Sequence, residues 1–119
     1  MDCITVLLVE DEILIRMDVA GKLRNEGFEV LEAGNANEAI RILEHDDAVR
    51  VLSDIDMPGS MDGLKLSAAI RDRWPPIKIV VTSGHRMVEI TDLPDGSVFF
   101  PKPYSHTRVA TTMRELLCN

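Results

Sequence analysis

The sequence is poor in residues that build metal clusters and disulfides. Its two cysteines, Cys3 and Cys118, lie near opposite ends of the chain, and no CxxC or Cys/His cluster is present. This spacing argues against a zinc site, and in a chain without a signal peptide we expect both thiols to stay reduced. The three histidines are scattered without ligand spacing. Metal binding through sulfur or imidazole is therefore not expected.

Long apolar runs and a surplus of positive charge are also missing. No apolar run approaches the ~20 residues that a membrane helix needs, so we expect a cytoplasmic protein without a membrane segment. The net charge of −7 argues against a nucleic-acid partner, because binding to phosphates needs a basic patch. The acidic balance is instead compatible with a cation or with a basic protein surface.

The 119 residues suit one domain, 1–119, in which five short apolar segments alternate with helical patterns. The strands are expected at residues 4–9, 28–33, 51–54, 77–81 and 98–100. Alternation of this kind predicts an α/β fold: a doubly wound, five-stranded parallel sheet with helices on both faces. No GxGxxG motif follows the first strand, so a dinucleotide site is not supported.

The helical segments are predicted from apolar spacing and capping residues. Asn35 and Glu38 resemble a capping box at the start of the second helix. The fourth helical segment, 87–93, is rich in β-branched residues and should be short or irregular. The first segment is closed by Gly27, and its expected inward face is made of residues at helical spacing: Ile13, Met17, Ala20 and Leu23.

Residues 51–59 are the most informative stretch. An apolar run ends in Asp54 and a Pro-Gly pair follows, which predicts a buried strand that ends in an acid at a tight turn. A carboxylate at the carboxyl end of a buried strand lies where open α/β sheets bind ligands. A purely structural role is the alternative, because Asp is common in turns and bonds its own backbone. Asp54 by itself does not decide between these hypotheses.

Four of the predicted strands end in charged or hydroxyl-bearing residues. These are Glu10-Asp11, Asp54, Thr82-Ser83 and Lys102. In a parallel sheet the four ends share one edge, where two carboxylates ~4 Å apart repel by about 4 kcal/mol at an effective dielectric near 20. A divalent cation would balance the excess of negative charge over Lys102, and carboxylate and carbonyl oxygens suit Mg²⁺. We therefore expect Mg²⁺ as the cofactor at this edge.

The same residue types can carry out phosphoryl transfer. The Asp54 carboxylate can attack phosphorus to give an acyl phosphate, a reaction that needs positioning and charge neutralisation more than covalent help. Mg²⁺ held by Asp11 and Asp54 would neutralise two phosphoryl oxygens and Lys102 a third, while the Thr82 hydroxyl would donate a hydrogen bond. Each residue is ordinary by itself, and their joint placement favours the functional hypothesis.

Several short motifs resemble the receiver domain of two-component response regulators over almost the whole chain. The motifs are LVEDE at 8–12, SDIDMPG at 53–59, MDG at 61–63, VT at 81–82 and KPY at 102–104. The resemblance implies a flavodoxin-like sheet in the strand order 2-1-3-4-5. It also implies a set of site residues: Asp54 as phospho-acceptor, Glu10 and Asp11 as the metal-binding acidic pair, Asp56 as the source of a backbone carbonyl for Mg²⁺, Lys102 as the family's lysine, Thr82 as the switch hydroxyl and Phe99 as the switch aromatic.

Three departures from the family pattern concern the loops and the switch. Ser60 adds one residue to the turn after Asp54, the interval from Thr82 to Lys102 is about two residues short, and Phe99 replaces the commoner tyrosine. These departures put the loop shape and the output surface in doubt. They leave the phosphorylation residues intact.

The resemblance implies a stand-alone, phosphorylation-operated binding module of bacterial signalling rather than a turnover enzyme. Its phosphoryl donor would be a phosphohistidine on a sensor histidine kinase or a histidine phosphotransfer protein. Its output would be contact with a downstream protein target or relay of the phosphoryl group. The sequence leaves open whether two copies form a homodimer.

Two alternative functions are weighed against this one. Asp54 and Asp56 have the Asp-x-Asp spacing of haloacid-dehalogenase-type phosphatases, which also use an aspartyl phosphate and Mg²⁺. However, Met57-Pro58 follows where that family usually has a Thr or Val, and the motif lies on the third predicted strand rather than the first. The second alternative is a pseudo-receiver that binds partners without phosphorylation. The intact acceptor, lysine and acidic pair argue against it.

Overall fold

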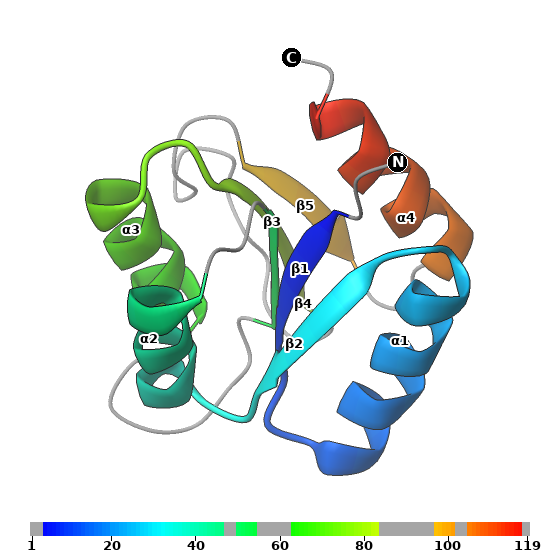
Figure 1. Cartoon of the computed structure of the whole chain (residues 1–119), viewed down its shortest axis with the longest axis horizontal. Coiled ribbons are helices and arrows are strands. Elements are labelled where there is room, and N and C mark those ends of the chain that lie inside the picture. The colour runs from blue at the N-terminus through cyan, green and yellow to red at the C-terminus, as the bar shows by residue number, and fades with distance from the viewer. Residues whose placement is uncertain (1–3, 47–49, 55–62, 84–96, 102–104, 118–119) are drawn as a thin grey trace.

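A five-stranded parallel sheet forms the centre of the computed structural model, which describes residues 4–46, 50–54, 63–83, 97–101 and 105–117. The strand order β2-β1-β3-β4-β5 confirms the predicted doubly wound fold. Helices α2 and α3 cover one face of the sheet, and α1 and α4 cover the other (Figure 1). In chain order the elements are β1 (Thr5–Val9), α1 (Ile13–Asn25), β2 (Glu29–Ala33), α2 (Ala36–His45), β3 (Arg50–Asp54), α3 (Gly63–Arg73), β4 (Lys78–Ser83), β5 (Val98–Pro101) and α4 (His106–Leu117).

The central strands are short apolar runs because both of their faces are covered by helices. In β1 every residue after Thr5 is buried, and in β3 Val51 and Leu52 are almost inaccessible to solvent. β2 lies at an edge of the sheet, and its sequence mixes polar with apolar residues, with Glu29 exposed and Glu32 half-buried. Interleaved polarity of this kind is typical of an edge strand, which is exposed to solvent more than a central one.

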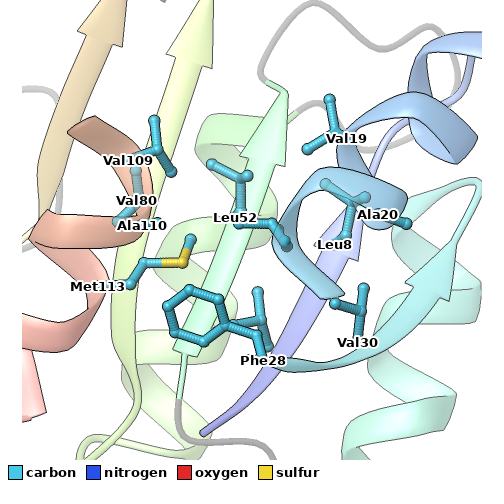
Figure 2. Close-up of a cluster of buried hydrophobic side chains, with 12 residues drawn as sticks. Leu8, Val19, Ala20, Phe28, Val30, Leu52, Val80, Val109, Ala110 and Met113 are labelled. Carbon is cyan, nitrogen blue, oxygen red and sulfur yellow. The ribbon is translucent and has the colours of Figure 1, made fainter. Parts of the chain in front are cut away.

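Successive side chains of a strand point to opposite faces, so the sheet contributes to two separate cores. Figure 2 shows the core on the α1/α4 face, where Leu52 and Val80 of the sheet lie against residues of both helices. The labelled residues of this core are Leu8, Val19, Ala20, Phe28, Val30, Leu52, Val80, Val109, Ala110 and Met113. The core on the α2/α3 face contains Leu7, Val9, Ala33, Ala36, Ala39, Leu43, Val51, Leu66, Ile70, Ile77 and Ile79.

The inward face of α1 differs from the one predicted. Ala20 and Leu23 are buried as expected, but Ile13 and Met17 are 59% and 60% exposed, so their assignment to the core was wrong. Traced back one turn from Ala20, the buried stripe passes through Arg16, whose side chain is only 19% exposed. Because the buried stripe of α1 passes through Arg16, Ile13 and Met17 lie outside the stripe and face the surface.

The end of α1 is fixed by the glycine that the sequence indicated. Gly27 has a φ of +97°, a left-handed conformation that favours glycine. Its amide donates to the Arg24 carbonyl at 3.0 Å, and the amide of Phe28 donates to the Leu23 carbonyl at 3.1 Å. These two bonds form a Schellman motif, accompanied by apolar packing of Phe28 and Leu23 in one core. The chain is thereby directed from α1 into β2.

The capping interaction predicted at the start of α2 is confirmed. The Asn35 Oδ1 atom accepts a hydrogen bond from the Glu38 amide at 2.9 Å. The Glu38 Oε1 atom in turn accepts from the amide of Gly34 at 2.8 Å, one residue before the usual partner in a capping box. The Gly34 backbone is therefore tied to α2 at the point where β2 has just ended.

Two of the predicted features fall outside the described residues. They are the short fourth helix expected at 87–93 and the turn that contains Ser60. The element labelled α4 is the helix that follows β5. Within the described ranges, no helix has both the length and the hydrophobicity that crossing a membrane requires.

Candidate functional site

Three strand ends meet at one edge of the sheet. In the register of the parallel strands, Val9 of β1 lies beside Ser53 of β3, and Asp54 at the end of β3 lies beside Thr82 of β4. Glu10 follows Val9 directly, so the chain leaves β1 near the level of Asp54. Asp54 lies between the ends of β1 and β4 because β3 pairs with both of these strands. The fold therefore gathers the predicted acceptor, acidic pair and hydroxyl.

The acidic pair Glu10-Asp11 is divided between interior and surface. Glu10 is 4% exposed, its amide donates to the Ala33 carbonyl at 3.0 Å, and its carbonyl accepts from Arg16 Nη1 at 3.0 Å. Asp11, the next residue, is exposed to solvent. Burial of a carboxylate is costly unless cations or hydrogen bonds compensate its charge. A carboxylate buried at this strand end thus fits an edge at which cations balance negative charge.

The predicted switch residues lie on neighbouring strands. Thr82 is 2% exposed, and it is paired across the sheet with Asp54 on one side and with Phe100 on the other. Phe99, which is half-buried, is paired with Val81. Because paired residues of parallel strands point to the same face, Phe100 shares the face of Thr82 and Phe99 the opposite one. The role of Phe99 as the switch aromatic stays a prediction.

The remaining predicted residues bear on whether a Mg²⁺ ion fits this edge. Asp56 and Lys102 lie outside the described residues, and Asp54 is described through its strand backbone. Within the described ranges, no group of three or more His, Cys, Asp or Glu side chains is gathered closely enough to hold a metal. The ligand set predicted from the sequence also includes Asp54 and Asp56, and it consists of oxygen donors. Together with Glu10 and Asp11, this chemistry fits Mg²⁺.

A cluster around Arg16 was not predicted from the sequence. The Arg16 Nε atom lies 3.4 Å from Glu32 Oε1 of β2, while its Nη1 atom bonds the backbone at the end of β1. A Cβ atom at Gly34 would lie only 2.8 Å from Nη1. The available signal was the spacing of Arg16 from Val19 and Ala20, which places it on the buried stripe of α1.

Four large apolar side chains are exposed on the first turns of α1. Ile13, Leu14, Ile15 and Met17 are 59%, 78%, 39% and 60% exposed, and they begin two residues after Asp11. A group of large apolar side chains at the surface marks an interaction site more often than an isolated one does. This group, called the α1 apolar surface below, borders the acidic pair.

Comparison with known proteins gives consistent results. The chain matches the response regulator receiver domain over residues 6–112. It is 39% identical over 118 residues to the sensor kinase CckA of Brucella abortus, an alignment that covers 95% of the chain and 12% of CckA. The chain thus corresponds to a small part of that relative's length.

Solved structures agree in fold over nearly the whole chain. A response regulator receiver protein from Sinorhizobium medicae superposes with a TM-score of 0.90 at 27% identity, covering 98% of this chain and 96% of the other. The receiver domain of NtrX from Brucella abortus superposes with a TM-score of 0.87 at 32% identity, covering 96% and 98%.

The first prediction concerns Asp11 and Mg²⁺. In chelator, Asp11→Asn should leave the free energy of unfolding unchanged within about 0.5 kcal/mol, because an exposed carboxylate beside other carboxylates contributes little. Mg²⁺ at ten times its dissociation constant should stabilise the wild type by about 1.4 kcal/mol, and it should stabilise the variant less. Urea unfolding with and without Mg²⁺ measures both effects.

Asp18→Asn is the matched control for this experiment. It also removes one exposed carboxylate of the same part of the chain, but Asp18 pairs with Lys22 at 3.2 Å. Its loss should lower stability modestly in chelator and leave the stabilisation by Mg²⁺ largely in place. Equal stabilisation of the wild type and Asp11→Asn by Mg²⁺ would contradict a role for Asp11 in holding the ion.

Proposed function

Because this chain belongs to the response regulator receiver domain family, we propose that it accepts a phosphoryl group on Asp54 from a phosphohistidine donor, with Mg²⁺ as cofactor. Phosphorylation then changes its contacts with a downstream protein or allows relay of the phosphoryl group. One observation carries the proposal: the register of the sheet sets Asp54 beside Thr82 and next to the end of β1, where the acidic pair begins.

The reaction follows from the chemistry of the gathered residues. A carboxylate oxygen of Asp54 attacks phosphorus, the bond from phosphorus to the donor nitrogen breaks, and an acyl phosphate remains on the chain. Asp11, Asp54 and the backbone carbonyl of Asp56 would hold Mg²⁺, which supplies neutralisation of phosphoryl charge when bound. The Thr82 hydroxyl donates to a phosphoryl oxygen, and Lys102 neutralises another. The residues thus contribute positioning and charge, the main requirements of phosphoryl transfer.

The α1 apolar surface supports a protein as the phosphoryl donor. A donor histidine must approach Asp54 at the sheet edge, so the protein that carries it must cover the surface bordering that edge. The exposed apolar side chains begin two residues after Asp11 and reach 78% exposure at Leu14. Their burial against the donor protein would supply binding free energy beside the reacting groups. The protein proposed to carry the donor histidine is a sensor histidine kinase or a histidine phosphotransfer protein.

The phosphatase alternative receives no support from these findings. The match to the receiver family covers residues 6–112, and the Asp54-x-Asp56 motif begins at the end of β3, the third strand along the chain. The family consists of signalling domains. A stable phosphoryl group on the chain, rather than turnover of a phosphate ester, is therefore the expected product.

The acceptor can be tested with a small phosphoryl donor. Acetyl phosphate and Mg²⁺ should add one phosphoryl mass to the wild type, and Asp54→Asn should gain none because the nucleophilic oxygen is lost. Intact-protein mass spectrometry measures the product, and excess chelator should prevent its formation. The conservative Ser53→Ala variant, one residue earlier in β3, is the matched control and should be phosphorylated. A phosphorylated Asp54→Asn chain would refute the assignment.

The donor surface can be tested by Leu14→Ala. This variant should react with acetyl phosphate at the wild-type rate, because Leu14 is 78% exposed and belongs to neither of the two described cores. Transfer from a phosphorylated histidine kinase should slow by on the order of 10-fold, as expected for an interface anchor. The kinase used is the member of a purified panel that phosphorylates the wild type fastest.

Asn25→Ala, at the other end of α1, is the control for this comparison and should leave both rates unchanged. Equal kinase rates for the wild type and Leu14→Ala would remove the α1 apolar surface from the donor interface. Slowing of both the kinase and the acetyl phosphate reactions would indicate damage to the site instead, and would also contradict the proposed interface.

A further inference from the structure

We propose that Arg16 is a positioning residue for the acidic pair: it fixes the peptide group that joins Glu10 to Asp11 and thereby holds Asp11 in place for Mg²⁺. This inference rests on the proposed function, since it concerns the same site. Arg16 is not itself a ligand of a cation, because a guanidinium carries only donors and a positive charge. Its action would pass through the backbone.

The contact that carries the inference is the bond from Arg16 Nη1 to the Glu10 carbonyl, at 3.0 Å. That carbonyl and the Asp11 amide belong to one planar peptide group. A hydrogen bond to the carbonyl oxygen therefore restricts the orientation of the whole peptide plane, and with it the position of the Asp11 Cα atom. On the other side of Glu10, its amide is held by the Ala33 carbonyl at 3.0 Å. The peptide groups flanking Glu10 are thus fixed from α1 and from β2.

Arg16 is itself held in a defined position. Its side chain is 19% exposed and lies on the buried stripe of α1, one turn before Ala20. Its Nε atom lies 3.4 Å from Glu32 Oε1 of β2, while its Nη1 atom bonds the residue that follows β1, so the guanidinium is held from two sides. An arginine with such partners loses fewer conformations when it bonds the Glu10 carbonyl than a free surface arginine would.

Gly34 keeps open the space that the guanidinium occupies. A Cβ atom at this position would lie 2.8 Å from Arg16 Nη1 and 3.0 Å from Glu38 Oε1. Displacing either atom would disturb a hydrogen bond, because Arg16 Nη1 donates to the Glu10 carbonyl and Glu38 Oε1 accepts from the Gly34 amide at 2.8 Å. Among the described residues Gly27 is the glycine with positive φ. The requirement at Gly34 is therefore one of space.

The positioning role and simple electrostatics predict opposite results. If Arg16 acted only as a nearby positive charge, its removal would strengthen the binding of a cation, because repulsion would be relieved. If it acts by holding the Glu10-Asp11 peptide, its removal weakens cation binding, as the loss of groups that orient metal ligands does. The sign of the change in Mg²⁺ affinity therefore separates the two explanations.

The experiment measures Mg²⁺ binding by titration calorimetry at fixed ionic strength for the wild type and four variants. Arg16→Met removes the bond, and Gly34→Ala displaces the guanidinium while keeping its charge. Both should weaken Mg²⁺ binding on the order of 10-fold. Arg16→Lys, which keeps a donor and a charge, should recover part of the loss. Circular dichroism establishes that each variant is folded, and urea unfolding gives its stability.

Arg24→Met is the matched control. Arg24 lies on the same helix, pairs with the same Glu32 at 3.1 Å and donates to a backbone carbonyl, that of Val30, at 3.0 Å. It makes the same kinds of bond as Arg16, but to β2 rather than to the end of β1. Its loss should change Mg²⁺ affinity less than twofold while lowering stability comparably.

Unchanged or tighter Mg²⁺ binding by Arg16→Met would overturn the inference. So would equal weakening by Arg24→Met, which would indicate a general loss of stability. If Arg16→Met does not fold, unchanged binding by Gly34→Ala overturns it instead. In each of these cases the inference fails, but the proposed function is still supported if the wild type binds Mg²⁺ and is phosphorylated. A wild type that binds no Mg²⁺ would refute the Mg²⁺ part of the proposed function, and this inference with it.

Discussion

The parallel pairing of β3 with both β1 and β4 is the constraint on which the site depends. Parallel strands bring their carboxyl ends to one edge. The acid at the end of β3 therefore lies close to the residues at the ends of β1 and β4. The register places Asp54 level with Thr82 and places the exit of β1 nearby. Apolar burial on both faces holds that register, since a slip of one residue would turn each core side chain to the wrong face.

Gathering carboxylates at one edge also creates a problem that the fold must solve. Like charges at close range repel, and Glu10 is almost fully buried. Hydrogen bonds from the Arg16 guanidinium and to the Ala33 carbonyl fix the backbone at this strand end. Arg16 bonds the Glu10 carbonyl and pairs with Glu32, so one side chain of α1 connects the ends of β1 and β2. The arrangement leaves the exposed Asp11 available to a divalent ion, as the proposed chemistry requires.

The course of α1 shows how a polar residue can serve two purposes in one helix. By occupying the inward position one turn before Ala20, Arg16 reaches the end of β1. The same phase of the helix turns Ile13 and Met17 outward, where they form the α1 apolar surface with Leu14 and Ile15. A helix with the phase predicted from the sequence, with its stripe through Ile13 and Met17, would have buried these two side chains. It would then have offered less apolar area to the proposed donor protein.

The strands and several helix ends were predictable from the sequence because local chemistry determines them. Apolar runs marked the central strands, Gly27 marked the end of α1, and Asn35 with Glu38 marked the start of α2. Half of the predicted inward face of α1, Ile13 and Met17, was wrong, because an arginine within a helix is normally read as a surface residue. The partners of Arg16 lie on β2 and directly after β1. No local pattern encodes such contacts.

The candidate site was predictable to the extent that it follows from strand ends. The strand pattern and the parallel topology were sufficient to predict that Glu10, Asp54 and Thr82 lie at the same edge of the sheet. Lys102 was also predicted from a strand end, whereas Asp56 was assigned through the resemblance to receiver domains; both lie outside the described residues. Their roles depend on how loops fold over the sheet edge, which strand periodicity does not specify.

The central claim is that Asp54, rather than another carboxylate of this edge, becomes the acyl phosphate. Borohydride reduces an acyl phosphate of aspartate to homoserine, so the modified position can be read by tandem mass spectrometry. After treatment with acetyl phosphate, Mg²⁺ and borohydride, homoserine should be found at position 54. Homoserine at position 11 or 56 instead, or at no position in a chain that has gained phosphoryl mass, would contradict the account.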